Sequence, residues 1–147
     1  MKRFVESDIR IRAKATDILE AILEYRHLKA WWGVDDAYIE KKDGGLYTLA
    51  WMKSPQGIKF ISTGRIKLYD FRSHLELENM IYLNAEKPIL GPCTVRYDVE
   101  QKSNYSILKV KQSGFQKGEH WEWYYKAVSD GWPQALIFLK KYLEKLN

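Results

Sequence analysis

The chain has 147 residues, of which 46% are hydrophobic, 29% charged and 14% aromatic, a composition typical of one globular domain spanning residues 1–147. The longest apolar run, residues 135–139, is too short to cross a membrane. The single Cys93 excludes an internal disulfide, and the net charge of +5 is spread without a basic run, which favours surface charge over nucleic-acid binding. We therefore expect a soluble cytoplasmic protein with no membrane insertion and no nucleic-acid partner.

The N-terminal part of the chain predicts a strand followed by two short helices. Apolar and charged residues alternate over residues 9–14, a pattern typical of a half-buried strand. Thr16 then precedes an apolar stripe over residues 18–23, so we expect a helix with Thr16 as its N-cap. A second helix is predicted from Tyr25 to Trp32, and Gly33 ends it.

The rest of the chain predicts strands and then one long helix. Apolar residues at three- and four-residue steps over residues 121–146 predict an amphipathic helix, and Pro133 predicts a kink or break near residues 130–133. The fold class is therefore α+β, with a curved antiparallel sheet of about seven strands wrapped round the C-terminal helix and the first strand beside the last. The strands after the helical pair are predicted at residues 37–42, 46–53, 58–69, 74–83, 94–102 and 105–114, with a loop at residues 84–92.

One face of the predicted sheet carries pairs of opposite charge. A four-residue loop at residues 70–73 places Tyr69 opposite His74, and the same register brings acidic and basic side chains together across the hairpins. Such pairs contribute roughly 0.2–1 kcal/mol each and indicate a solvated outer face. The predicted pairs are Lys67 with Glu76, Arg65 with Glu78 and Asp98 with Lys109.

The opposite face is largely apolar but interrupted. Ser62, Asn79 and Gln112 place polar groups on it, and Gly64 and Gly114 leave it unfilled. One interpretation is a cavity between sheet and helix in which a few polar groups orient a ligand. The alternative is that the glycines mark bulges and that the amides bond to backbone or water.

No residue pattern indicates a metal, a cofactor or a catalytic residue. His27, His74 and His120 lie far apart without the spacing of metal ligands. Cys93 is expected to be a buried, inert thiol. Phosphate loops, dinucleotide fingerprints and nucleophile elbows have recognisable signatures, and we find none.

Several motifs of low individual specificity follow one another in an order that resembles a known superfamily. They are Ile9 to Ala13 before a helix, Leu28 to Gly33, Gly44-Gly45 opening a strand, Gly64 within the next, Gly114-Phe115, and Gly131-Trp132 ahead of residues 135–144. Together they resemble the SRPBCC (START-like) superfamily and, within it, the Aha-like homologues of the activator of the heat-shock-protein-90 ATPase. The resemblance covers nearly the whole chain and implies a helix-grip fold of the Bet v-like type. It also implies a hydrophobic cavity for lipids, polyketides or aromatic compounds, but no catalytic signature.

Three functions follow from these patterns. The first is a non-enzymatic protein that binds a small apolar or aromatic molecule, lipids included. The second is a co-chaperone-like domain that stimulates a chaperone ATPase. The third is a cyclase- or hydrolase-type enzyme acting on a bound ring compound, with Tyr47 or Tyr97 as proton donor if the cavity lowers its pKa. The sequence does not indicate an oligomeric state. The candidate ligand-binding residues are Trp31, Trp32, Tyr47, Leu49, Trp51, Ser62, Asn79, Tyr97, Gln112, Trp121 and Tyr125.

Overall fold

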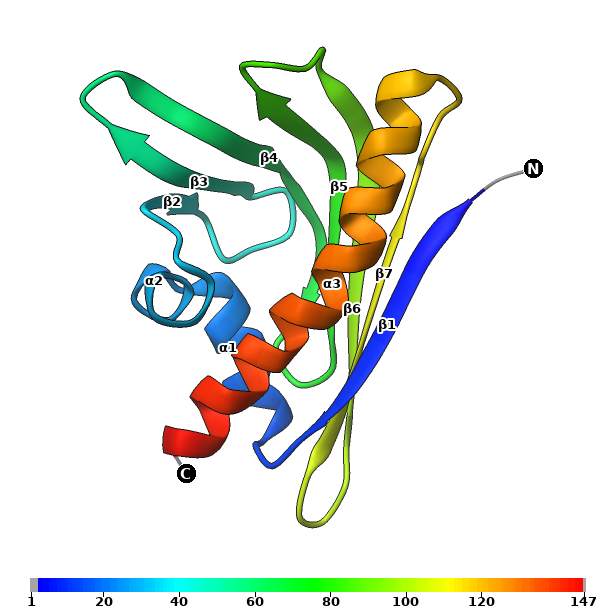
Figure 1. Ribbon diagram of the computed structural model, residues 1–147. Helices are drawn as coiled ribbons and strands as arrows, with labels where there is room; N and C mark the ends of the chain where they lie inside the picture. Colours follow the sequence, from blue (N-terminus) through cyan, green and yellow to red (C-terminus); the bar gives the residue numbers. More distant parts are fainter. Residues whose placement is uncertain (1–2, 147) are drawn as a thin grey trace.

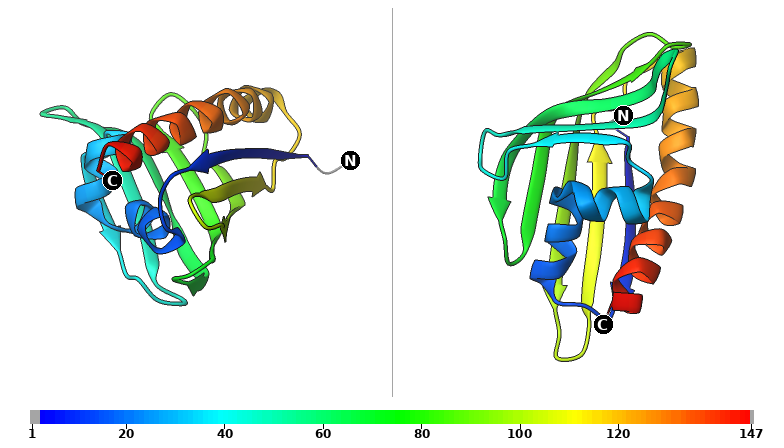
Figure 2. Two further views of the ribbon diagram at one scale, coloured as in Figure 1. Left: turned by 90° about the horizontal axis from the view of Figure 1, so that it is seen from below. Right: turned by 90° about the vertical axis from the view of Figure 1, so that its left-hand side faces the viewer.

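The computed structural model describes residues 3–146, in which seven strands form one curved antiparallel sheet and three helices lie on its concave side (Figures 1 and 2). The architecture is the α+β arrangement predicted from the sequence. In chain order the elements are β1 (Phe4–Ile11), α1 (Ala15–Leu23), α2 (Tyr25–Trp32), β2 (Asp36–Ile39), β3 (Leu46–Ser54), β4 (Gly57–Asp70), β5 (His74–Asn84), β6 (Leu90–Gln101), β7 (Ser106–Ser113) and α3 (Glu119–Leu146).

The strands are arranged in the order β1-β7-β6-β5-β4-β3-β2, so the first strand pairs with the last, as predicted. β1 begins and ends earlier than the alternating pattern indicated, because the Ala13 amide bonds the Ile11 carbonyl at 2.9 Å and turns the chain toward α1. β6 also begins earlier, at Leu90, and includes the end of the expected loop.

Thr16 is not the N-cap of α1. The helix begins at Ala15, and the Lys14 side chain in the cap position makes no capping hydrogen bond. The Ala15 amide instead donates to Oε1 of Gln101 at 2.9 Å, at the far end of β6. A tertiary contact therefore replaces the local cap. The limits of α2 agree with the prediction, and Gly33 has the left-handed φ of 69° that suits glycine at a helix end.

Bulges in β4 and β5 shift the predicted inner face. The β4–β5 register changes between Thr63 and Arg65, and the β5–β6 register changes between Leu77 and Met80. A bulge adds one residue to a strand and so exchanges the faces beyond it. Asn79, at a φ of 55°, is exposed and does not face α3. Met80 and Tyr82 line the interior instead.

The turn between β4 and β5 is one residue shorter than predicted. Asp70 lies opposite His74, so Tyr69 faces Leu75 rather than His74. Leu68, which alternation from Ser62 and Gly64 places on the inner face, is 46% exposed, because a second register shift between Ile66 and Leu68 turns it outward.

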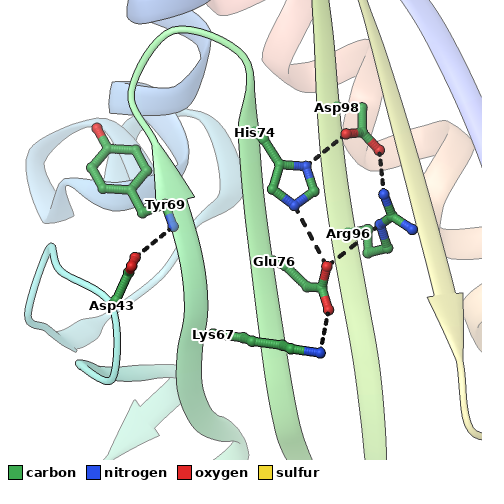
Figure 3. A network of polar contacts seen from close by, with 7 residues as sticks. All are labelled: Asp43, Lys67, Tyr69, His74, Glu76, Arg96 and Asp98. Carbon is green, nitrogen blue, oxygen red and sulfur yellow. Dashed lines mark hydrogen bonds and ion pairs between the residues drawn. The ribbon is translucent and has the colours of Figure 1, made fainter.

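The outer face of the sheet carries the predicted charge pairs and a wider network (Figure 3). Lys67 Nζ lies 3.4 Å from Glu76 Oε2, and His74 Nδ1 lies 2.6 Å from Asp98 Oδ1, while Arg96 contacts both carboxylates. Exposed ion pairs contribute about 0–1 kcal/mol each, so this network stabilises the outer surface modestly. The other predicted partners also face one another across the strands, Arg65 with Glu78 and Asp98 with Lys109.

α3 is one continuous helix of 28 residues that runs through Pro133, so the predicted break does not occur. An interior proline costs about 3 kcal/mol, and the buried stripe on both sides of it offsets that cost. The stripe consists of Trp132, Ala135, Leu136, Leu139 and Leu143. α3 crosses the sheet diagonally and contacts β1 and α2 (Figure 1). Within residues 3–146 no helix combines the length and apolar character that a membrane crossing requires.

Candidate functional site

A cavity of about 380 Å³ lies between the sheet and α3. This volume falls in the lower part of the range of small-molecule sites, roughly 300–1,000 Å³. Residues of α2, of strands β3 to β7 and of α3 form its wall. Aromatic rings make up much of that wall: Trp32, Tyr47, Trp51, Phe60, Tyr82, Tyr97, Trp123, Tyr124 and Trp132.

The structure brings most of the candidate residues together around this cavity. Those that line it are Trp32, Tyr47, Leu49, Trp51, Ser62, Tyr97 and Gln112. Asn79 points away because of the bulge in β5. Trp31, Trp121 and Tyr125 also lie outside the wall, and contact of the lining residues with a ligand stays a prediction.

The three excluded aromatic residues support the structure around the cavity. Trp31 stacks behind Trp32, with ring centroids 4.8 Å apart, and its indole N–H donates to the Ala21 carbonyl at 2.9 Å. Trp121 and Tyr125 pack edge-on against Phe115, at centroid distances of 6.4 and 5.1 Å.

The candidate ligand-binding residues do not include six of the larger side chains on the wall: Phe60, Met80, Tyr82, Trp123, Tyr124 and Trp132. In α3 the error is one of helical phase. Tyr124, Val128 and Trp132 recur every four residues and face the cavity, as residues spaced in this way do. That stripe is visible in the sequence, whereas the predicted residues Trp121 and Tyr125 belong to the neighbouring stripe of the helix. Alternation continued from Leu75 places Met80 and Tyr82 on the outer face, which is wrong. Because residues 80–83 are all apolar, the sequence does not mark the bulge that turns them inward.

The glycines on the inner face do not create the cavity. A side chain at Gly64 would meet Sδ of Met80 and the carbonyls of β5, and one at Gly114 would meet the Pro92 carbonyl. The space above each glycine is therefore occupied, and Gly64 lies within the bulge in β4. Gly64 therefore fits the alternative interpretation of a bulge, whereas Gly114 follows the end of β7; both glycines allow close approach of neighbouring backbone.

Gln112 connects β7 to α3 across the cavity wall. Its side chain is 5% exposed, its Oε1 accepts from Trp132 Nε1 at 2.9 Å, and its Nε2 donates to the Tyr124 hydroxyl at 3.2 Å. The buried amide is thus bonded to two side chains, which gives both of its polar atoms a partner and fixes two aromatic rings.

The buried tyrosines of the cavity hold their protons. Burial raises the pKa of Tyr47 well above its ordinary value and also raises the pKa of Tyr97, because a phenolate loses its hydration in an apolar interior. The Tyr47 hydroxyl donates to the Ile22 carbonyl at 2.8 Å. Neither tyrosine has the lowered pKa that the enzyme hypothesis requires, so both act as neutral hydrogen-bonding groups near pH 7.

A curved sheet closed round a long helix, with an apolar hollow between them, defines a helix-grip domain of the SRPBCC (START-like) class. Within that class, the model of the family described as "Activator of Hsp90 ATPase homolog 1-like protein" matches residues 12–144, and the chain belongs to this family. The sequence resemblance to Aha-like domains is thereby confirmed. No curated protein sequence matches the chain.

Solved structures share the fold at low sequence identity. Protein MLL2253 from Mesorhizobium loti is 16% identical, with 99% of each chain covered and a TM-score of 0.78. The Aha1 dimer from Colwellia psychrerythraea is 15% identical, with 97% of this chain and 96% of that chain covered and a TM-score of 0.72. DynU16, a putative protein in the dynemicin biosynthetic locus, is 16% identical with a TM-score of 0.73, and the match spans 96% of this chain but 47% of DynU16.

Proposed function

We propose that the protein binds a small hydrophobic or aromatic ligand in the cavity beneath α3 and does not transform it. The observation that carries this proposal is the volume of about 380 Å³ bounded largely by aromatic rings. Rigid rings bury much apolar surface on a flat ligand at a low cost in side-chain entropy.

The chemistry of the wall supports binding rather than catalysis. The hydroxyls of Tyr47 and Tyr97 stay protonated near neutral pH, since burial raises the pKa of each. Within the described part of the chain, the residues that line the cavity include no Lys, Arg, His, Asp or Glu. The wall therefore offers shape, apolar surface and neutral hydrogen bonds, which suit retention of an uncharged molecule.

Membership of the family favours a chaperone as the alternative partner. The family description names an activator of the Hsp90 ATPase, and one structural relative is an Aha1 dimer. A co-chaperone role would use the outer surface and leave the cavity unexplained. ATPase assays with Hsp90 address it directly: stimulation at micromolar concentration would favour this alternative.

Tryptophan fluorescence tests the ligand-binding proposal, because Trp32, Trp51 and Trp132 line the cavity. Titration with a library of lipids and neutral aromatic compounds should give saturable quenching. Ala135 is 6% exposed and lies on the wall, so Ala135→Phe should fill the space and weaken binding at least tenfold. Ala30→Phe, the same substitution at an exposed position of α2, serves as the matched control.

Two results would contradict the proposal. One is the absence of saturable binding by any member of the library. The other is unchanged affinity in a folded Ala135→Phe protein, with circular dichroism spectra used to establish that the variant is folded.

A further inference from the structure

The polar groups on the buried part of the cavity wall are almost all engaged within the protein. Tyr47 donates to the Ile22 carbonyl, and Gln112 and Trp132 bond each other. At the side of the wall, the Trp51 indole N–H donates to the Trp32 carbonyl at 3.1 Å. These groups hold the wall in place and have little capacity left for a ligand.

Tyr97 is the exception among the buried polar side chains of the wall. It lies on β6, is 3% exposed, and lines the cavity. Among residues 3–146 its hydroxyl has no hydrogen-bond partner, whereas every polar side-chain atom that is fully sealed in this part of the chain has one. The Tyr97 hydroxyl therefore opens onto the cavity itself. Its ring is fixed edge-on against Trp132, at a centroid distance of 5.8 Å and an interplanar angle of 81°.

An unpartnered buried hydroxyl is unfavourable for stability but useful for recognition. A polar group that loses its hydration without gaining a partner destabilises the folded state. A ligand that supplies an acceptor removes that penalty, whereas an analogue without the acceptor does not. The Ser62 hydroxyl and the Trp32 indole N–H on the same wall are also without a partner in residues 3–146, and the hydroxyls of Tyr82 and Tyr124 act there only as acceptors. All four side chains are half-buried, so each discriminates less than Tyr97.

We propose that Tyr97 is the specificity-determining donor of the cavity and selects flat, uncharged ligands that carry a carbonyl or comparable acceptor oxygen at their buried end. This inference rests on the proposed ligand-binding function and narrows its ligand class. The acceptor must be neutral, because the described lining residues provide no cation to balance a carboxylate or phosphate. The aromatic walls select the flat ring system, and the Tyr97 hydroxyl selects its oxygen.

Three naphthalenes of similar size separate these features. 2-Acetylnaphthalene carries a neutral acceptor, 2-ethylnaphthalene carries none, and 2-naphthoate carries a charged one. Their affinities are measured by displacement of the neutral fluorescent ketone 6-propionyl-2-(dimethylamino)naphthalene. The wild-type protein should bind the ketone at least tenfold more tightly than 2-naphthoate.

Tyr97→Phe removes the hydroxyl alone. The variant should bind 2-acetylnaphthalene about threefold to tenfold more weakly than the wild type, as expected for one hydrogen bond. Its affinity for 2-ethylnaphthalene should not change. Tyr38→Phe is the matched control, since Tyr38 lies on β2, is 64% exposed and does not line the cavity. This control should leave the ratio of ketone to hydrocarbon affinity unchanged.

A second measurement does not depend on ligand. Because the hydroxyl is unpartnered, Tyr97→Phe should be at least as stable to urea as the wild type when no ligand is present. Clear destabilisation would show that the hydroxyl is bonded within the protein and would overturn the inference.

The remaining outcomes separate this inference from the proposed function. Equal binding of the ketone by the wild type and Tyr97→Phe would overturn the role of Tyr97 and leave ligand binding intact. Naphthoate binding as tight as that of the ketone would overturn the selection for neutral ligands. Absence of binding by both neutral naphthalenes up to their solubility would overturn this inference, whereas the library titration decides the proposed function by itself.

Discussion

Replacement of Gln112 by leucine tests whether the cavity wall is held by the bridge between β7 and α3. The substitution keeps the volume of the side chain but removes the acceptor of Trp132 and the donor to Tyr124. Two hydrogen bonds contribute about 1–3 kcal/mol together, and the Trp132 indole, 9% exposed, is left without a partner. The more apolar leucine offsets part of this loss. We expect a net destabilisation of about 2 kcal/mol, or a fall in Tm of about 4–8 °C for a domain of this size.

Urea unfolding followed by circular dichroism measures this loss, and a second background isolates its cause. In Trp132→Phe no indole N–H remains to be stranded, so Gln112→Leu should cost about 1 kcal/mol less there than in the wild type. Gln116→Leu is the control, because the exposed Gln116 side chain donates to the Gly114 carbonyl of its own loop and its replacement should lower the free energy of unfolding by less than about 0.5 kcal/mol. An equal loss in the free energy of unfolding on Gln112→Leu in the two backgrounds would refute the hydrogen bond between Gln112 and Trp132 as the source of the stability.

Three further predictions concern stability. Burial, with a smaller contribution from Arg26, lowers the pKa of His27, whose Nδ1 lies 2.6 Å from the Tyr142 hydroxyl. As the pH falls, the unfolded chain therefore binds a proton at His27 before the folded protein does. The free energy of unfolding should decrease as the pH drops below about 6.5. Urea titrations at pH 7 and pH 5 should show this dependence weakened in His27→Gln, and an unchanged dependence would exclude His27 as its source. Gly131→Ala places a methyl group in open space within α3 and should stabilise the protein by about 0.5–1 kcal/mol in thermal melts, whereas a lower Tm would indicate an undetected clash. Met52 is 57% exposed at a φ of 56°, so Met52→Gly should relieve about 1 kcal/mol of backbone strain and raise the free energy of unfolding. A decrease of that size would show that the contacts of the Met52 side chain stabilise the protein more than the strain destabilises it.

Local sequence signals predicted most of the fold. Gly33 ends α2 in the left-handed conformation, and the turn residues before Leu46 and Gly57 separate strands at the expected places. These features succeeded because they depend on the conformational preferences of a few adjacent residues. The cap of α1 failed for the opposite reason, since Gln101 supplies it from 86 positions away.

The inner face was harder to predict, because the alternation of side chains between the two faces of a sheet is interrupted at a bulge. Alternation holds from Leu75 to Leu77 and then ends at Asn79, beyond which four apolar residues follow one another. Asparagine tolerates a positive φ better than most residues, so Asn79 is a possible bulge position. The sequence does not indicate which of the side chains after it turn inward. The polar wall residues Ser62, Tyr97 and Gln112 were found because their strands keep their alternation at those positions.

Trp31 shows how a residue outside the cavity can determine its shape. Its indole is bonded to the Ala21 carbonyl of α1 and stacks on Trp32, and the Trp32 carbonyl in turn accepts from Trp51. Each ring is therefore fixed by a neighbouring ring or a hydrogen bond, and a wall of this kind resists collapse into the hollow. Because the positions of these rings depend on contacts with α1 and α2, a substitution in either helix that moves Trp32 should alter the shape of the cavity, since Trp32 is the residue of those helices that lines it.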